Sequence, residues 1–370
     1  MRRLNPLRSV ECMAVLIASE RASAQEEYAS DFTGLMTQVR ATGLLERRYA
    51  WYAVRVAILL SLFAAAFAAL FALGSSPWQL LLAVGFSFLF TQSAFLAHDS
   101  AHRQVFTSGK RNEWLSRVVG NLVVGLSYGW WMNKHTRHHA NPNKVGKDGD
   151  IAPGAIVFTK ADALERTRVP EWLTARQHWF FLPILMLAGI DLHIHAGRAA
   201  LGGEQIKHRV VEGAMLAVRL IGFPILVVVA AGPWMGLGFM VVQLFAFGVY
   251  MGGTFAPNHK GMPIVPRDMT LDFLRRQVLM SRNISGGPVV GIGMGGLNFQ
   301  IEHHLFPSMP SINLRRVRPL VRAYCDERGI PYTETTFVGS YRIVLRYLQR
   351  VGVRHADPFD CPLAEQFRTG

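Results

Sequence analysis

The sequence predicts an all-α integral membrane protein, with four transmembrane helices in two hairpins and a mainly helical cytoplasmic cap. Half of the 370 residues are hydrophobic and only 17% are charged, a balance that soluble domains rarely have. Four apolar segments are long enough to cross a bilayer, which takes about 20 residues. The segments fall into two pairs, and within each pair only a short uncharged linker separates them.

The two predicted hairpins cover about 56–97 and 213–256. Each linker contains glycine, proline and tryptophan, which favours a tight turn near a membrane surface. Arg219 and Pro224 interrupt the third apolar segment, and an arginine near a helix end can extend its charge toward the interface. The four predicted spans are 56–73, 79–97, 213–231 and 235–256.

The distribution of lysine and arginine predicts the orientation. Both linkers are uncharged, whereas basic residues flank the outer ends of both hairpins. Because positive charges near helix ends stay in the cytoplasm, both hairpins should enter and leave from that side. The apolar stretches 118–131 and 179–190 are too short to span comfortably and are predicted as interfacial helices or helices under the cap.

Three parts follow from this topology. They are a cytoplasmic N-terminal segment 1–50, a membrane domain 51–325 and a cytoplasmic C-terminal tail 326–370, of which the last dozen residues should be loosely ordered. No apolar stretch follows the N-terminal arginines, so no signal peptide is expected. The net charge of +14 fits a basic cytoplasmic surface, and long apolar spans argue against a nucleic-acid partner.

Eight of the thirteen histidines fall into a pattern. His98 and His102 follow the second span at i, i+4 spacing, which places both on one helix face. A second group and a third group repeat an i, i+3, i+4 spacing, with glutamine at the first position of the third, and one more histidine ends the fourth span. These residues are His135, His138 and His139; Gln300, His303 and His304; and His259.

The predicted topology brings all eight histidines to the cytoplasmic side, where they can form one site. A metal ion takes about four to six ligands, so eight imidazoles indicate two ions. Imidazole suits iron, zinc, copper or nickel, and the spacing alone leaves these open. Asp99 and Glu302 lie inside the motifs and are expected to accept hydrogen bonds from ligand imidazoles. The remaining histidines lack the spacing and are predicted not to be ligands: His178, His193, His195, His208 and His355.

The three motifs, in this order and relative to two hairpins, resemble the histidine boxes of membrane fatty acid desaturases. The stretch Q-I-E-H-H-L-F-P at 300–307 resembles the front-end and bacterial linoleoyl-CoA-desaturase-like branch. The resemblance implies iron ligands at the seven motif histidines and at His259, and leaves direct ligation by Gln300 open. Those seven are His98, His102, His135, His138, His139, His303 and His304.

The resemblance also implies a reaction and its partners. A pair of iron ions would use O2 to introduce a cis double bond into a fatty acyl chain carried by CoA or by a lipid. No H-P-G-G haem motif precedes His98, so the electrons are expected from a separate ferredoxin, cytochrome or flavoprotein reductase. The expected location is a bacterial inner membrane, or the endoplasmic reticulum of a eukaryote. Two alternatives stay open, an acyl or sphingolipid hydroxylase with the same metals and a non-enzymatic membrane protein.

Overall fold

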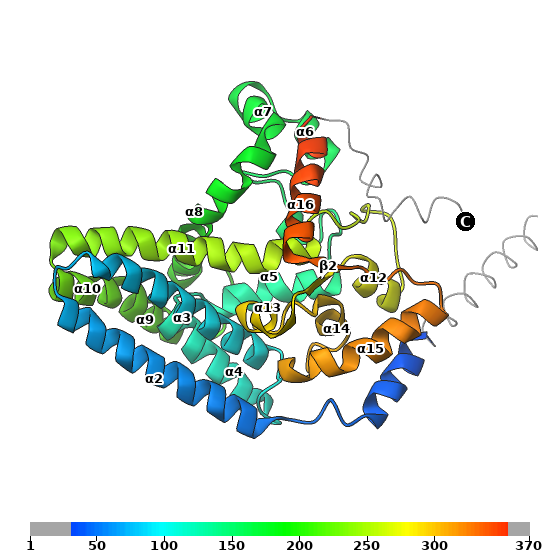
Figure 1. Ribbon diagram of the computed structural model, residues 1–370. Coiled ribbons are helices and arrows are strands. Elements are labelled where there is room, and N and C mark those ends of the chain that lie inside the picture. The colour runs from blue at the N-terminus through cyan, green and yellow to red at the C-terminus, as the bar shows by residue number, and fades with distance from the viewer. Residues whose placement is uncertain (1–30, 354–370) are drawn as a thin grey trace, which may run out of the picture.

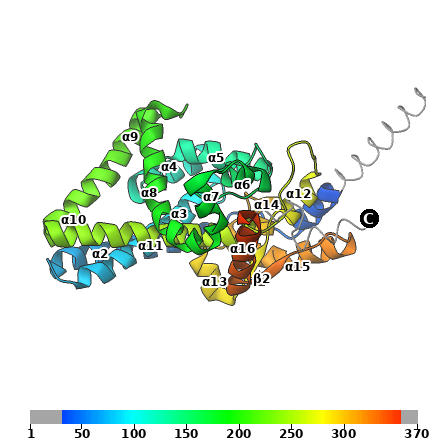
Figure 2. The same ribbon diagram turned by 90° about the horizontal axis from the view of Figure 1, so that it is seen from above.

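The computed structural model describes residues 31–353, so the predictions for the last dozen residues, for His355 and for much of the N-terminal segment lie outside it. Four long helical segments run side by side and form two hairpins (Figures 1 and 2). They are α2 (Tyr49–Leu73), α3 (Trp78–Ala101), α11 (Pro233–His259), and a composite of α9 (Arg209–Ala217), η4 (Val218–Gly222) and α10 (Phe223–Ala231).

The other elements lie between and after these hairpins. Between them are α4 (Gly109–Arg117), η1 (Val118–Val124), α5 (Tyr128–Ala140), η2 (Gly149–Ile151), α6 (Lys160–Leu164), α7 (Arg168–Ala175), α8 (Gln177–Arg198) and η3 (Ala199–Gly203). After them are α12 (Phe273–Leu279), β1 (Asn283–Ser285), α13 (Gly287–Gly293), α14 (Gln300–Leu305), α15 (Ser311–Glu327), β2 (Glu334–Thr336) and α16 (Phe337–Gly352). The strands β1 and β2 form a short parallel pair in which Ile284 lies opposite Thr335.

Phenylalanine side chains fill the interior of the hairpin bundle. The ring of Phe86 lies 5.4 Å from that of Phe223 and 5.7 Å from that of Phe239, so one residue of α3 joins both hairpins. The outward faces are apolar as well, and Val229 is 74% exposed. A helix bundle that is hydrophobic both in its interior and on its outer surface is typical of a membrane protein, whose outer surface faces lipid.

Within residues 31–353, five helices are long and apolar enough to cross a membrane, one more than the sequence predicted, and the additional one is α8 with its continuation η3. The sequence predicted only 179–190 here, because Pro183 and the polar residues Asp191, His193 and His195 interrupt the apolar pattern. In both views α8 crosses the hairpins instead of running along them (Figures 1 and 2). Its backbone meets α11 closely, since a Cβ atom at Gly248 would lie 2.5 Å from the carbonyl oxygen of Leu185.

Arg219 is buried inside the bundle and does not extend toward the interface. Its Nε donates to the carbonyl oxygen of Val123 at 2.9 Å, and its guanidinium lies 4.1 Å from the centre of the Phe90 ring. Residues 218–222 around it are π-helical, and Pro224 stands in the first turn of the α-helix that follows. The two residues that interrupt the third apolar segment therefore mark a change of helix type inside one continuous span.

The cap has two apolar cores, and the second of them joins it to the bundle. A helical segment at 31–41 contributes Leu35 and Val39 to a core with α12, α14 and α15. The second core joins α16, through Val344 and Leu348, to α6 and α8. The region predicted as a C-terminal tail thus contains a helix that packs against the membrane domain.

A buried ion pair connects α4 to the start of the second hairpin. The Nε of Arg117 lies 3.2 Å from Oε1 of Glu212, and both side chains are at most 1% exposed. Glu212 also accepts hydrogen bonds from the hydroxyl of Ser127 at 2.7 Å and from the backbone N–H of Gly129. One carboxylate therefore holds three segments of the chain together.

We expect Glu212→Ala to lower the free energy of unfolding by about 3–5 kcal/mol, because it removes the buried one of the two carboxylates that pair with the buried guanidinium of Arg117. Glu113→Ala is a matched control, since Glu113 pairs with the same arginine but is 29% exposed, and it should cost less than about 1 kcal/mol. Unfolding in mixed detergent and SDS micelles measures both values. Equal losses in the two variants would contradict this account of the ion pair.

Candidate metal centre

The fold brings all eight patterned histidines together at one end of the hairpin bundle, in two clusters. Within each cluster the nitrogen atoms that could bind a metal lie within 4.8 Å of one another. Cluster A consists of His98, His102, His135, His139 and His303. Cluster B consists of His138, His259 and His304.

Helix geometry explains this division. On α5, His135 and His139 are one turn apart and face cluster A, whereas His138 points to the neighbouring cluster. On α14, the consecutive residues His303 and His304 likewise separate between the clusters. The rings of His139 and His304 stack with their centres 4.3 Å apart, so the two clusters lie side by side.

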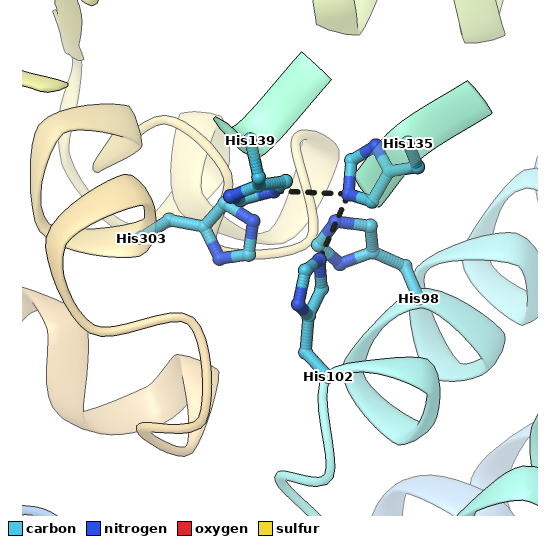
Figure 3. A group of neighbouring side chains, drawn as sticks. All are labelled: His98, His102, His135, His139 and His303. Carbon is cyan, nitrogen blue, oxygen red and sulfur yellow. Dashed lines mark hydrogen bonds between the residues drawn. The ribbon is translucent and has the colours of Figure 1, made fainter. Parts of the chain in front are cut away.

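In cluster A the imidazoles face inward with few partners (Figure 3). Nε2 of His135 lies 2.8 Å from Nε2 of His102 and 3.0 Å from Nε2 of His139. His98 and His303 are buried, and within the described part of the chain neither ring nitrogen of either residue has a hydrogen-bond partner. Such buried, unpaired nitrogens cost about 1–3 kcal/mol each unless they bind something.

In cluster B each ring is oriented through its Nδ1 atom. His138 contacts Oδ2 of Asp148, His304 contacts Oε1 of Gln277, and His259 contacts the carbonyl oxygen of Met280, at 2.9, 2.9 and 3.0 Å. An acceptor at Nδ1 keeps the proton on that atom and leaves the Nε2 lone pair available for a metal. This is the arrangement that metal-binding histidines usually have.

The surroundings of most of these histidines favour the neutral form of the imidazole ring. Burial, followed by the neighbouring imidazoles, holds the pKa values of five of these histidines well below the ordinary value: His102, His135, His139, His303 and His304. Burial also lowers the pKa of His138, but its hydrogen bond to Asp148 and the charge of Asp150 outweigh this and raise it overall. Neutral imidazole is the form that binds metal ions.

Asp99 and Glu302, the two carboxylates predicted to accept hydrogen bonds from ligand imidazoles, have different surroundings. Oδ1 of Asp99 lies 3.7 Å from Nδ1 of His98, while its Oδ2 accepts hydrogen bonds from Arg55 and Ser311. Glu302 accepts from Tyr332 and Asn283 and contacts no histidine of either cluster, contrary to the expectation. Each residue of a helix is turned by about 100° from the last, so Glu302 faces away from the side that His303 and His304 share.

Gln300 lies at cluster B, where its amide Nε2 is 2.9 Å from Nε2 of His259. Its Oε1 accepts from the side-chain amide of Asn258 at 3.0 Å. The glutamine therefore occupies the position that a further imidazole would have, against the nitrogen that His259 would offer to a metal.

The remaining described histidines stay outside both clusters. Nε2 of His193 lies 3.2 Å from the carbonyl oxygen of Val124, and His195 stacks on Trp130. His208 lies against the ring of Trp114, and His178 is only partly buried.

Four groups next to cluster B were not identified from the sequence. Asp148 and Asp150 follow the second motif closely, and an acidic pair at that distance is a signal that could have been used. Asp148 also accepts from the backbone N–H groups of Asn143 and Asp150, which fixes its carboxylate. Gln277 and the Met280 carbonyl carry no local signal, because only tertiary structure brings them to His304 and His259.

An apolar cavity of about 40 Å³ ends on cluster A. His98 and Trp131 form its polar end, and Trp131 stacks on His135 with the ring centres 4.1 Å apart. Apolar residues of α3, η1 and α11 form the rest of the wall, among them Ala94, Val124 and Met251. Cluster A therefore adjoins apolar surface inside the bundle through His98.

The residues present fit a pair of metal ions. Both donor sets consist of imidazole, their lone pairs converge, and several buried nitrogens have no other partner. All-imidazole donors suit iron, zinc, copper or nickel better than magnesium or calcium. A further group of possible ligands consists of His138, Asp148 and Asp150, and it shares His138 with cluster B. Asp150 also forms an ion pair with Lys134 at 2.8 Å.

This fold and site are those of a helical membrane protein whose histidine clusters could hold metal ions, and comparison with known proteins gives its family. The sequence model described as fatty acid desaturase matches residues 75–336, more than half of the chain. The chain belongs to the fatty acid desaturase family. All eight histidines of the two clusters lie within the matched range.

Individual relatives are moderately similar. An acyl-lipid (9-3)-desaturase of Physcomitrium patens is 28% identical over 91% of this chain and 66% of its own length. The enzyme of the same name from Borago officinalis is 28% identical over 73% of this chain and 63% of its own. The Delta(5) fatty acid desaturase fat-4 of Caenorhabditis elegans is 29% identical over 86% of this chain and 73% of its own length. The chain thus covers slightly less than two thirds of the first two relatives.

We expect Asp148→Asn to weaken metal binding in cluster B by about 10–100-fold, because His138 loses the carboxylate that orients its ring. Metal content per chain, measured by inductively coupled plasma mass spectrometry after dialysis against a weak chelator, should fall. Asp191→Asn is the control, since this carboxylate is 70% exposed and lies outside the centre. Full metal retention in Asp148→Asn would rule out the orienting role.

Proposed function

We propose that this protein desaturates a fatty acyl chain, using O2 and two iron ions held by the two histidine clusters. The observation that carries the proposal is the position of the clusters, which lie side by side, with cluster A at an apolar cavity inside a membrane-type bundle. The three relatives described above are all desaturases, which favours removal of hydrogen over insertion of a hydroxyl group.

In this proposal the ligands are the eight histidines. Cluster A would hold one ion through His98, His102, His135, His139 and His303, and cluster B the other through His138, His259 and His304. Bound iron would supply the O2-dependent oxidation of an unactivated C–H bond, which side chains cannot perform alone. Gln300 would stand beside the second ion, next to His259.

The protein's own contribution is orientation and exclusion of water. Asp148, Gln277 and the Met280 carbonyl hold the three rings of cluster B, which keeps their Nε2 atoms directed to one point. Trp131 and the apolar wall of the cavity would hold two neighbouring methylene groups beside cluster A. Such positioning decides which carbons react, because the chemistry itself does not distinguish one methylene from another.

The proposed topology has four spans with the metal centre on the cytoplasmic side. The basic residues at the outer ends of both hairpins support that side. α8 would lie at the membrane interface, since it crosses the hairpins (Figure 2). The proposed location is a bacterial inner membrane, with an acyl-CoA or acyl-lipid substrate and a separate electron donor such as a ferredoxin, cytochrome or flavoprotein reductase.

The fatty acid profile of cells that express the protein with a compatible reductase tests this proposal. Gas chromatography and mass spectrometry of methyl esters should show a new unsaturated acid with the wild type and none with His138→Ala, which removes a proposed ligand. His178→Ala, outside both clusters, should retain at least about half of the product.

Other products would change the conclusion. A hydroxy acid that depends on His138 would assign a hydroxylase with the same metal centre. An unchanged profile, together with no iron in the purified wild type, would contradict the enzymatic proposal altogether.

A further inference from the structure

Pro257 interrupts the hydrogen bonds of α11 two residues before this helix ends at His259. A proline has no backbone N–H, so the carbonyl oxygen four residues earlier, that of Gly253, loses its partner within the helix. Gly253 is buried, and a buried carbonyl group without a partner costs free energy. Because His259 belongs to cluster B, the interrupted turn is the one that presents a histidine to the metal centre.

Tyr341 of α16 supplies the missing hydrogen bond. Its hydroxyl group donates to the carbonyl oxygen of Gly253 at 2.9 Å. Glycine leaves room for this contact, because a Cβ atom at 253 would lie only 3.3 Å from the phenol oxygen. Burial raises the pKa of Tyr341 to about 12, so the hydroxyl keeps the proton that it donates. A side chain of α16 thus replaces the N–H group that Pro257 lacks.

The carbonyl oxygen of Pro257 is also bound from outside α11. It accepts from the hydroxyl of Ser340 at 2.7 Å and from Nε of Arg282 at 2.9 Å. Ser340 and Arg282 are fully buried, and Nη2 of Arg282 donates to the hydroxyl oxygen of Ser340 at 2.9 Å. The two donors therefore hold each other in place as well as the proline.

Arg282 also fixes the residues on either side of His259. Its backbone N–H donates to the carbonyl oxygen of Asn258 at 2.9 Å, and its Nη2 donates to that of Lys260 at 3.0 Å. Met280, two residues earlier, offers the carbonyl that orients the His259 ring. The strand β1 begins directly after Arg282, and its partner β2 ends directly before α16. The parallel pair thus joins the segment 280–282 to α16 as one support for the end of α11.

An apolar core holds α16 against α11 at the same place (Figure 1). Val344 and Leu348 of α16 share this core with Ala256, the residue before Pro257. Apolar contacts have no preferred direction, whereas a hydrogen bond weakens steeply when its angle changes. The core therefore brings the two helices together, and the hydroxyl groups determine how the end of α11 is directed.

We propose that Tyr341 is a positioning residue of cluster B, which fixes the direction of His259 through the proline-interrupted end of α11. The inference rests on the proposed ligand role of His259, and it makes α16 part of the structure that supports the metal centre. Groups that orient a metal ligand contribute to metal affinity although they do not touch the metal. Tyr341 acts one step further out, because it binds the backbone that carries the ligand.

Iron retention by the purified, iron-loaded protein tests this role. The variant is Tyr341→Phe, which removes one hydroxyl group and leaves the ring in place. Tyr324→Phe is the matched control, because this hydroxyl also donates to a backbone carbonyl, that of Asp31, but belongs to the core of α12, α14 and α15. Iron per chain is measured after dialysis against graded concentrations of a chelator. Mössbauer spectra of the retained iron are compared with those of His259→Ala, which lacks a proposed cluster B ligand.

We expect Tyr341→Phe to bind the cluster B iron about 3–10-fold more weakly, which is the contribution of one hydrogen bond. The cluster A iron, and both irons of the control, should stay within about twofold of the wild type. The iron that Tyr341→Phe retains should give the spectrum of the iron that His259→Ala retains. Unchanged affinity in Tyr341→Phe would overturn the proposal, and so would an equal loss from both clusters or an equal loss in the control.

A second substitution tests the reason for the loss. Alanine at 257 has the N–H group that proline lacks and can bond to the Gly253 carbonyl within the helix. Adding Pro257→Ala to Tyr341→Phe should therefore return the affinity for the cluster B iron to within about twofold of the wild type. If the affinity does not recover, the phenol does not compensate for the proline and the proposal is wrong.

The outcome is separable from that of the desaturase proposal, because hydrogen exchange of the amides at 254–259 follows the end of α11 without iron. If the wild type holds no iron at cluster B, the proposed centre fails. Faster exchange in Tyr341→Phe than in the control would then still support the positioning of α11 by Tyr341, and equal exchange would overturn it. If the wild type forms the unsaturated product but Tyr341→Phe matches it in exchange and iron affinity, the reaction stands and this inference fails.

Discussion

The architecture depends on the burial of eight imidazoles whose nitrogen atoms are only partly satisfied by protein groups. Neutral imidazole has one donor and one acceptor, and among the described residues both ring nitrogens of His98 and of His303 in cluster A have no hydrogen-bond partner. Without a shared partner at their centre, this packing would be unfavourable, because buried unpaired nitrogens lose their hydration. The rest of the cap can be understood as the structure that forces these rings together and fixes their direction.

The two clusters differ in how many hydrogen bonds hold their rings in place. Cluster B is rigidly supported, with an acceptor at the Nδ1 atom of each ring. Cluster A has fewer such supports and adjoins the apolar cavity, through His98 and Trp131. Under the proposed function, the less constrained cluster is thus the one that meets hydrocarbon, and the better supported one lies behind it.

Much of this site was predictable from the sequence, because the histidine motifs are local and helix geometry decides which residues share a face. The spacing at 135–139 predicts that His135 and His139 point together, and they do. The position of His138 in the other cluster could not be predicted, since it depends on where α11 and α14 lie. Glu302 illustrates the same limit, because its proximity in sequence to His303 did not place it on the metal side of α14.

The fold was predicted less completely where polar residues interrupt apolar segments. The sequence placed the ends of the four spans within seven residues of the ends of α2, α3, the composite of α9, η4 and α10, and α11, because each of these segments is long and mostly apolar. For α8 the predicted segment was too short, because the polar residues Asp191, His193 and His195 resemble the end of a span. The helix nevertheless continues through them. The packing of α8 on α11 at Gly248 is a tertiary contact that no local pattern encodes.

The most direct test of the account is the number and identity of metal ions in the purified wild-type protein. Iron analysis combined with Mössbauer spectroscopy should find two irons per chain, in nitrogen-rich environments, because cluster A and cluster B each offer a convergent set of imidazoles. A single ion per chain, or zinc in place of iron, would contradict the proposal that the two clusters form one di-iron centre.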